Sequence, residues 1–412
     1  MEKLKKTKEL LFYIYPLAFI VGPAVIEILS ILISLIFFII TLKNKDLKYF
    51  KNKFFYFFIF WNLYLIFTSF ISDNIYLSLE SSLFYFRFII LSLALWHTLE
   101  NSKNFLKFFC ISLLIVFIFV QVDSYVQYFY GKNFLGFEFD RFSQARLSGV
   151  FNTEWILGSY ISRLLPLLLA LLILSYSVSL KLKIVSMILL ISSDILIFLS
   201  AERTAFFYLI LTTLMMLIFL NSFKILRIFC LILSMTLIVI ISLSSDVSKK
   251  RIIDKTFDDL ITDSGKLAIF SVQHQVIYET SIKIFNDNKF FGIGPKNFRE
   301  ICKLDKYKSF TDEDGSVDGC QTHPHNTYVQ LLTETGLVGI FPIIFIFFYV
   351  SFIFFKQFYF LYFKNKYYMK DGLILLYIAV FITIWPFVPT GNFFNNYINF
   401  IYFLPVGFII YE

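Results

Sequence analysis

Residues 10–42 read LLFYIYPLAFIVGPAVIEILSILISLIFFIITL, an apolar run that is interrupted by Gly22-Pro23. Lysine-rich sequence flanks this run on both sides, at 3–8 and at 43–53. Because basic flanks of membrane helices stay on the cytoplasmic side, two basic flanks require two crossings. The stretch therefore predicts a pair of membrane helices, near 10–22 and 24–42.

The composition of the whole chain also indicates a membrane protein. Of its 412 residues, 58% are hydrophobic, 16% are charged and 56 are Phe, and the mean hydropathy is +0.74. One soluble core cannot bury that much apolar surface. The apolar stretches have about the ~20 residues of a spanning helix, and they lack the alternation of barrel strands. We therefore predict an all-α fold, a polytopic helical bundle.

The basic start of the chain, followed by an apolar run, is similar to a signal peptide. No small-residue cleavage site follows the run, so we expect a retained first helix. Ten further apolar segments predict about twelve membrane helices in all. These segments are 54–71, 81–99, 105–129, 155–179, 184–200, 204–220, 225–243, 336–355, 373–389 and 396–411.

The basic residues of the short loops fix the predicted orientation. Lys and Arg outnumber Asp and Glu by 37 to 29, and the excess lies mainly in loops that fall on the side of the N-terminus. This distribution is typical of a protein in a phospholipid bilayer, and we expect no nucleic-acid partner. Both termini are then cytoplasmic. The polar segment 244–335 is predicted to be one outer loop domain, between the helices of 1–243 and those of 336–412.

A polar segment with two histidines precedes one of the long apolar runs. It reads His323-Pro324-His325-Asn326, and Gly336 and Gly339 follow at the start of the run. The pattern of His-Asn, nine residues and Gly-x-x-Gly resembles the signature of the O-antigen ligase and polymerase superfamily. These proteins are membrane glycosyltransferases that move lipid-diphosphate-linked glycans on the outer face of the bacterial inner membrane.

The resemblance implies a metal-independent, inverting enzyme that needs no cofactor and whose active site faces the periplasm. Its donor would be an undecaprenyl-diphosphate-linked glycan. The acceptor is lipid A-core in a ligase and a second lipid-linked glycan in a polymerase. The spacing of the motif is the ligase form, so we predict a ligase, with a polymerase as the alternative. A multi-helix transporter is a third interpretation, but it leaves the histidine segment unexplained.

His325 is the predicted catalytic residue, because glycosyl transfer needs a base for the proton of the acceptor hydroxyl and a neutral imidazole titrates near working pH. Asn326 beside it is a predicted substrate contact, and His323 is expected to be structural or to support His325. Arg203 lies in the predicted turn 201–207, where the superfamily places an arginine that binds the donor diphosphate. Its guanidinium suits bidentate phosphate contacts. An interfacial arginine that binds lipid headgroups, or one that pairs with Glu202, is the alternative.

A second arginine of the resembled family is missing here. Tyr278 and Gly292-Ile293-Gly294 align with the family pattern, but His274 occupies the arginine position. We rank His274 first as its substitute, and Arg251 and Arg299 from the same outer segment are the other candidates for binding substrate. Arg146 is predicted to line the entrance of the site, as a similar stretch does in the family.

Cys302 and Cys320 both lie in the predicted outer segment, just before the histidines. An oxidising periplasm would allow them to form a disulfide that tethers the histidine segment. Two unpaired buried thiols are the alternative, since closeness in sequence does not ensure disulfide geometry.

Ionisable residues interrupt several predicted membrane helices. Charges are costly at the bilayer centre, so such residues mark polar cavities or pair with each other. Most of them fall in the outer half of their helices, which predicts a polar cavity that opens to the periplasm. Ion pairing within the bundle is the competing interpretation. The residues are Glu27, Arg87, Asp123, Arg163 and Asp194.

Overall fold

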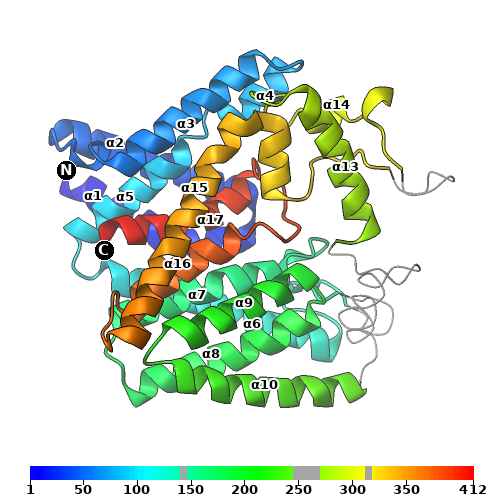
Figure 1. Ribbon diagram of the computed structural model, residues 1–412. Coiled ribbons are helices and arrows are strands. Elements are labelled where there is room, and N and C mark those ends of the chain that lie inside the picture. Colours follow the sequence, from blue (N-terminus) through cyan, green and yellow to red (C-terminus); the bar gives the residue numbers. More distant parts are fainter. Residues whose placement is uncertain (140–145, 245–269, 311–317) are drawn as a thin grey trace.

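The computed structural model describes residues 1–139, 146–244, 270–310 and 318–412. Over these residues the chain is a bundle of α-helices, and the β-pairing there is limited to two isolated bridges. The long helices extend from the end of the molecule that holds both termini to the end that holds α13 and α14 (Figure 1). The predicted all-α class is confirmed.

Helices are found at all twelve apolar segments that the sequence singled out. By length and composition, eight spans within the described residues can cross a membrane, while α9, α16 and α17 are shorter apolar helices. The number of twelve crossings therefore stays a prediction. The helices are α1 Glu2–Val21, α2 Pro23–Lys43, α3 Lys53–Phe70, α4 Ile75–Ser82, α5 Arg87–Asn101, α6 Phe105–Tyr130, α7 Leu157–Ser175, α8 Leu180–Leu199, α9 Arg203–Phe219, α10 Lys224–Ser244, α13 Val272–Asp287, α14 Phe298–Ile301, α15 Thr327–Phe363, α16 Asp371–Thr383 and α17 Asn396–Tyr411.

The Gly-Pro pair divides the first apolar run as predicted. Gly22 has a φ of 137°, which a residue with a side chain rarely adopts, and it separates α1 from α2. Pro23 is the first residue of α2, where its missing N–H costs no hydrogen bond. The two helices pack against each other.

Two boundaries near the C-terminus differ from the prediction. The segment expected to be helical over 373–389 is helical only to Thr383, because Pro386 and Pro389 cannot continue a helix. The helix expected to begin at 336 begins at Thr327, but Gly336 has non-helical angles (φ 66°, ψ −170°) and breaks α15 there. The loop between α16 and α17 and this break both belong to the candidate site.

Most of the charges inside the predicted helices pair with one another. Arg87 forms an ion pair with Glu27 at 2.8 Å, and Arg227 forms one with Asp194 at 2.7 Å. Asp123 accepts hydrogen bonds from the Asn133 side chain and the Phe134 N–H. Ion pairing and loop capping thus account for Glu27, Arg87, Asp123 and Asp194. Arg163 is the one of the five that lines the cavity of the candidate site.

The positions of α13 and of the α15–α16 loop give a test of orientation. Glu279 on α13 and Lys366 in the α15–α16 loop are both exposed, and α13 and that loop lie at opposite ends of the bundle (Figure 1). A membrane-impermeant thiol reagent added to intact spheroplasts should label Glu279→Cys, and it should label Lys366→Cys only after the membrane is opened. The wild-type protein is the control, because Cys110 and Cys230 are buried and Cys302 is joined to Cys320. Labelling of both variants from the same side would contradict the orientation.

Candidate active site

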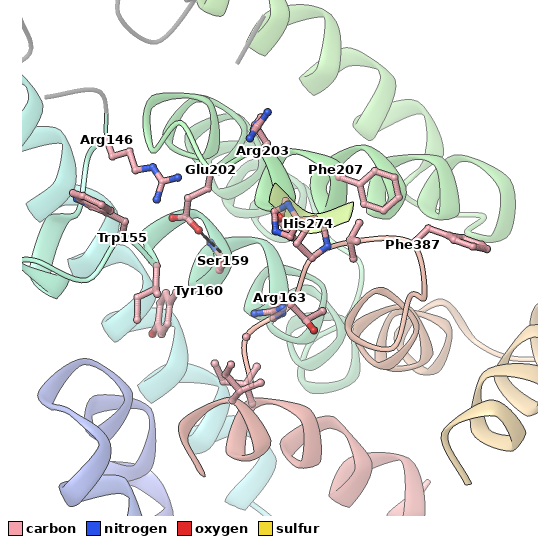
Figure 2. Close-up of a pocket in the computed structure, with 18 of the residues that line it drawn as sticks. Arg146, Trp155, Ser159, Tyr160, Arg163, Glu202, Arg203, Phe207, His274 and Phe387 are labelled. Atoms are coloured by element: carbon pink, nitrogen blue, oxygen red, sulfur yellow. Dashed lines mark hydrogen bonds between the residues drawn. The ribbon is translucent and has the colours of Figure 1, made fainter. Parts of the chain in front are cut away.

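A cavity of about 480 Å³ lies where α7, the α8–α9 turn, the start of α13, the α16–α17 loop and α17 meet. Three arginines and a histidine line it: Arg146, Arg163, Arg203 and His274 (Figure 2). Among the described lining residues, Glu202 is the single carboxylate. The arrangement therefore concentrates positive charge and N–H donors around one space. Such a space suits an anion with several oxygens.

Glu202 fixes the turn that carries Arg203. Its buried carboxylate accepts hydrogen bonds from the backbone N–H of Gly158 at 2.6 Å, from that of Ser159 at 3.1 Å and from the Ser159 hydroxyl at 2.7 Å. Burial raises the pKa of Glu202, and these hydrogen bonds and Arg146 oppose the rise. A carboxylate at the start of α7 also complements the helix dipole. The α8–α9 turn is thus tied to α7, and Arg203 is held at the start of α9 above the cavity.

Arg163 lies in the same wall, inside α7. It is almost fully buried, and its guanidinium donates a hydrogen bond to the Tyr208 hydroxyl at 3.1 Å. The guanidinium carbon is also 4.9 Å from the centre of the Tyr208 ring and 5.7 Å from that of Tyr402. Aromatic rings and a neutral hydroxyl stabilise the cation without neutralising it. The sequence singled out Arg163 as a charge in a membrane helix, but it gave no indication of its neighbours.

Arg146 lies on another side of the cavity, next to Trp155. The guanidinium carbon is 5.1 Å from the centre of the indole ring, and Trp155 is 56% exposed. Arg146 therefore lines the cavity, and its place at the entrance of the site stays a prediction. Figure 2 shows Arg146 and His274 on opposite sides of Glu202.

The three histidines of the outer segment lie together. The ring of His325 is 4.0 Å from that of His323 and 5.9 Å from that of His274, measured between ring centres. His274 lines the cavity, whereas His325 does not line it but contacts the His274 ring. Burial lowers the pKa of His325 below its ordinary value. Burial and, next, the neighbouring His325 lower the pKa of His323 to about 3, so both imidazoles are neutral near pH 7.

The α16–α17 loop holds His325 in an unusual backbone conformation. His325 has a φ of 55°, in the left-handed region where a residue with a side chain costs ~1–3 kcal/mol. Its carbonyl accepts a hydrogen bond from the Thr390 N–H at 2.7 Å, and the Thr327 and Thr390 hydroxyls are 3.0 Å apart. Tyr328 and Gln330 add contacts to the same loop. Because Thr390 also lines the cavity, the loop connects the histidine segment to the cavity wall.

Asn326 uses its whole side-chain amide within the protein. The amide oxygen accepts from the N–H groups of Tyr328 at 2.9 Å and Val329 at 3.0 Å, which caps α15. The amide nitrogen donates to the carbonyls of Pro386 at 2.7 Å and Val388 at 3.2 Å. All four hydrogen-bonding positions of the amide are filled. This favours a positioning role for Asn326 over the predicted substrate contact.

Gly336 of the sequence motif forms a tight junction with the 289–294 segment, to which Gly292 also contributes. A Cβ on Gly336 would lie 2.2 Å from the carbonyl oxygen of Phe290, and one on Gly292 would lie 2.4 Å from the carbonyl carbon of Glu334. Backbone hydrogen bonds cross the junction, from the Gly294 N–H to the Glu334 carbonyl at 2.8 Å and from the Leu337 N–H to the Lys289 carbonyl at 2.9 Å. The glycines therefore permit a backbone contact that anchors the break in α15.

The structure joins Cys302 and Cys320 in a disulfide, with a Cα–Cα distance of 5.1 Å. The bridge ends three residues before His323 and adds to a small separate core that includes Ile277, Phe298 and Tyr307. Closing a loop of 18 residues stabilises a fold by ~3 kcal/mol in the chain-entropy model.

One other predicted residue lies away from the cavity. Arg299 on α14 does not line it, but its charge acts on His323 and helps to lower the pKa of that imidazole. Arg251 lies outside the described residues. The structure thus gathers Arg146, Arg203 and His274 at one cavity, and His325 contacts His274.

The contribution of the α16–α17 loop was not anticipated from the sequence. Pro386, Pro389 and Gly391, followed by three asparagines at 392, 395 and 396, are typical loop residues, and they could have corrected the predicted span 373–389.

Residues 185–344 match the family model described as O-antigen ligase. The resemblance to the O-antigen ligase superfamily is confirmed. The match covers Arg203, His274, Arg299 and His325, whereas Arg146, Arg163 and the α16–α17 loop lie outside it. No curated protein matches the chain. The family is one of glycosyl-transfer enzymes of the O-antigen ligase type, and with its many apolar helices the chain is a multi-pass bacterial membrane protein.

The glycine junction gives a matched pair of variants. Gly336→Ala places a Cβ against Phe290 at a φ of 66°, whereas Gly136→Ala at a φ of 83° meets no atom within 4 Å. In both variants an alanine in the left-handed conformation costs ~1–2 kcal/mol. Only Gly336→Ala also forces the junction apart. We expect Gly336→Ala to lower the melting temperature of the purified protein by clearly more than Gly136→Ala. Equal shifts would contradict the close contact.

Proposed function

We propose that the protein is an O-antigen ligase-type glycosyltransferase of the bacterial inner membrane. It would transfer a glycan from undecaprenyl diphosphate to lipid A-core on the periplasmic face. The observation that supports this most directly is the cavity with Arg146, Arg163 and Arg203 on its walls and His325 in contact with its His274. A diphosphate carries several charged oxygens, and guanidinium groups bind such oxygens in pairs.

The arginines would act mainly on the leaving group. When the bond between the sugar and the diphosphate breaks, negative charge grows on the diphosphate oxygen. Arg203 at the turn and the buried Arg163 would stabilise that charge, and because they are fixed in place, little reorganisation is needed during the reaction. His274, on the position where the family has an arginine, would add an N–H donor. We propose that this donor set replaces a metal ion.

His325 would serve as the general base. The acceptor hydroxyl attacks the anomeric carbon on the face opposite the diphosphate, its proton passes to the neutral imidazole, and the electrons of the broken bond go to the diphosphate. This displacement inverts the anomeric centre. The lowered pKa keeps His325 neutral and ready to accept a proton. His274 lines the cavity and contacts the His325 ring, and it would help to orient that ring.

Deletion of the gene tests the assignment at the level of product. The surface glycans of the mutant, run on a gel, should show unmodified lipid A-core, with long chains retained on the lipid carrier. Products with a single repeat unit attached to lipid A-core would instead indicate a polymerase, which uses the same chemistry with a different acceptor. Unchanged glycans would contradict both assignments.

Separate tasks for His325 and Arg203 predict separate defects. His325→Ala should lower the rate of transfer by ~10²–10⁴ and leave donor binding nearly unchanged, because loss of a base acts on the chemical step. Arg203→Lys should weaken donor binding and also lower the rate of transfer, since a point charge cannot reproduce the bidentate contact. Donor binding and transfer are measured in the same membranes at equal expression, with His323→Ala as the control for loss of an imidazole. Near-normal transfer by His325→Ala would overturn the base assignment.

The burial of His325 predicts the pH dependence. Because burial lowers its pKa below the ordinary 6.5, the neutral base form persists to more acidic pH than for an exposed histidine. With saturating donor, the acidic limb of the rate of transfer should have its midpoint below pH 6.5. An acidic limb with a midpoint above 6.5 would contradict this assignment.

A further inference from the structure

A second cavity lies on the side of the bundle, between α9 and α10 and next to α8. Its volume is about 160 Å³. The side chains at its rim are only half buried: Ile210 is 45% exposed, Leu214 is 49% exposed and Met235 is 48% exposed. The cavity is therefore a groove that opens toward the surroundings of the helices, which in a membrane is lipid. We call it the α9–α10 groove.

The polar residues in the wall of the α9–α10 groove are occupied by one another. Arg227 pairs with Asp194 at 2.7 Å, and its Nε donates to the Thr213 hydroxyl at 3.1 Å. The Ser234 hydroxyl donates to Asp194 at 2.6 Å. All four residues are buried. The surface left for an occupant is therefore apolar, and it suits a hydrocarbon chain rather than a sugar or a phosphate.

One face of α9 connects the groove to the arginine cavity. Arg203, Phe207, Ile210, Leu214 and Leu217 follow one another at spacings of four, three, four and three residues, so they lie in one stripe. The first two line the arginine cavity and the last three line the groove. At ~1.5 Å per residue, the stripe from Arg203 to Leu217 is ~21 Å long, over half of the ~30 Å hydrocarbon layer.

We propose that the α9–α10 groove binds the polyisoprenoid chain of the donor while its diphosphate occupies the arginine cavity. The inference rests on the proposed function, because it takes the diphosphate to lie at Arg203. A chain attached to that diphosphate begins at the top of the stripe, and the apolar groove continues from there. Since moving the chain from bilayer to groove gains no hydrophobic free energy, the benefit is packing and orientation. The groove would set the direction from which the anomeric carbon meets His325.

Photo-crosslinking tests the location of the chain without requiring transfer. The probe is a polyisoprenoid diphosphate with a photoreactive group on the chain, and the peptides that it labels are mapped by mass spectrometry. We expect labelling of the peptides that contain Leu214 and Met235, and loss of that labelling in Leu214→Trp, whose indole fills the groove. Ile232→Trp is the matched control, because Ile232 is 64% exposed on α10 but does not line the groove.

The same variants give a kinetic readout. Leu214→Trp should raise the KM for the lipid-linked donor about fivefold, as expected for the loss of one well-packed contact, and Ile232→Trp should leave it unchanged. Labelling spread over all lipid-facing helices, or equal labelling of the groove by a photoreactive phospholipid, would overturn the proposal. If the groove is labelled but the protein transfers no glycan, the α9–α10 groove binds the chain and the proposed function is refuted instead.

Discussion

The geometry of the site depends on the four hydrogen bonds of the Asn326 side chain. Two of them begin α15 and two attach it to the α16–α17 loop, so one residue sets both the direction of the helix and the position of the loop. His325, immediately before it, is thereby held in a left-handed conformation that an unconstrained chain would leave. The same loop lines the arginine cavity. The position of His325 relative to the cavity is thus set by one hydrogen-bonded junction.

A second constraint is the need to hold cations in a largely apolar bundle without neutralising them. Arg227 is matched by Asp194 and contributes to structure, whereas Arg163 is stabilised by the aromatic faces of Tyr208 and Tyr402. The carboxylate of Glu202 accepts hydrogen bonds from residues at the start of α7. These differences separate the structural charges of the bundle from those at the cavity. Among the described lining residues the arginines outnumber the one carboxylate, that of Glu202, and this excess of positive charge favours an anion in the cavity.

The sequence predicted the helices well, because hydropathy and basic loops are local properties. It also indicated His325, Arg203, His274 and Arg146 as candidates, through a resemblance that carries information about distant contacts. It missed the loop after α16, because an apolar stretch concealed the effect of Pro386 and Pro389. The sequence also did not show that Arg163 contacts aromatic rings whereas Arg87 forms an ion pair. Their partners, such as Tyr402 and Glu27, are brought close only by folding. Arg251 lies outside the described residues, and its role stays a prediction.

The central claim is that one cavity holds the diphosphate of the donor beside a neutral histidine. An experimental structure of the protein with a non-transferable lipid-diphosphate-glycan analogue would test it most directly. We predict that both phosphates contact the guanidinium groups of Arg203 and Arg163, with the anomeric carbon facing His325. A diphosphate bound elsewhere, with the arginine cavity empty or filled by the glycan alone, would contradict the account.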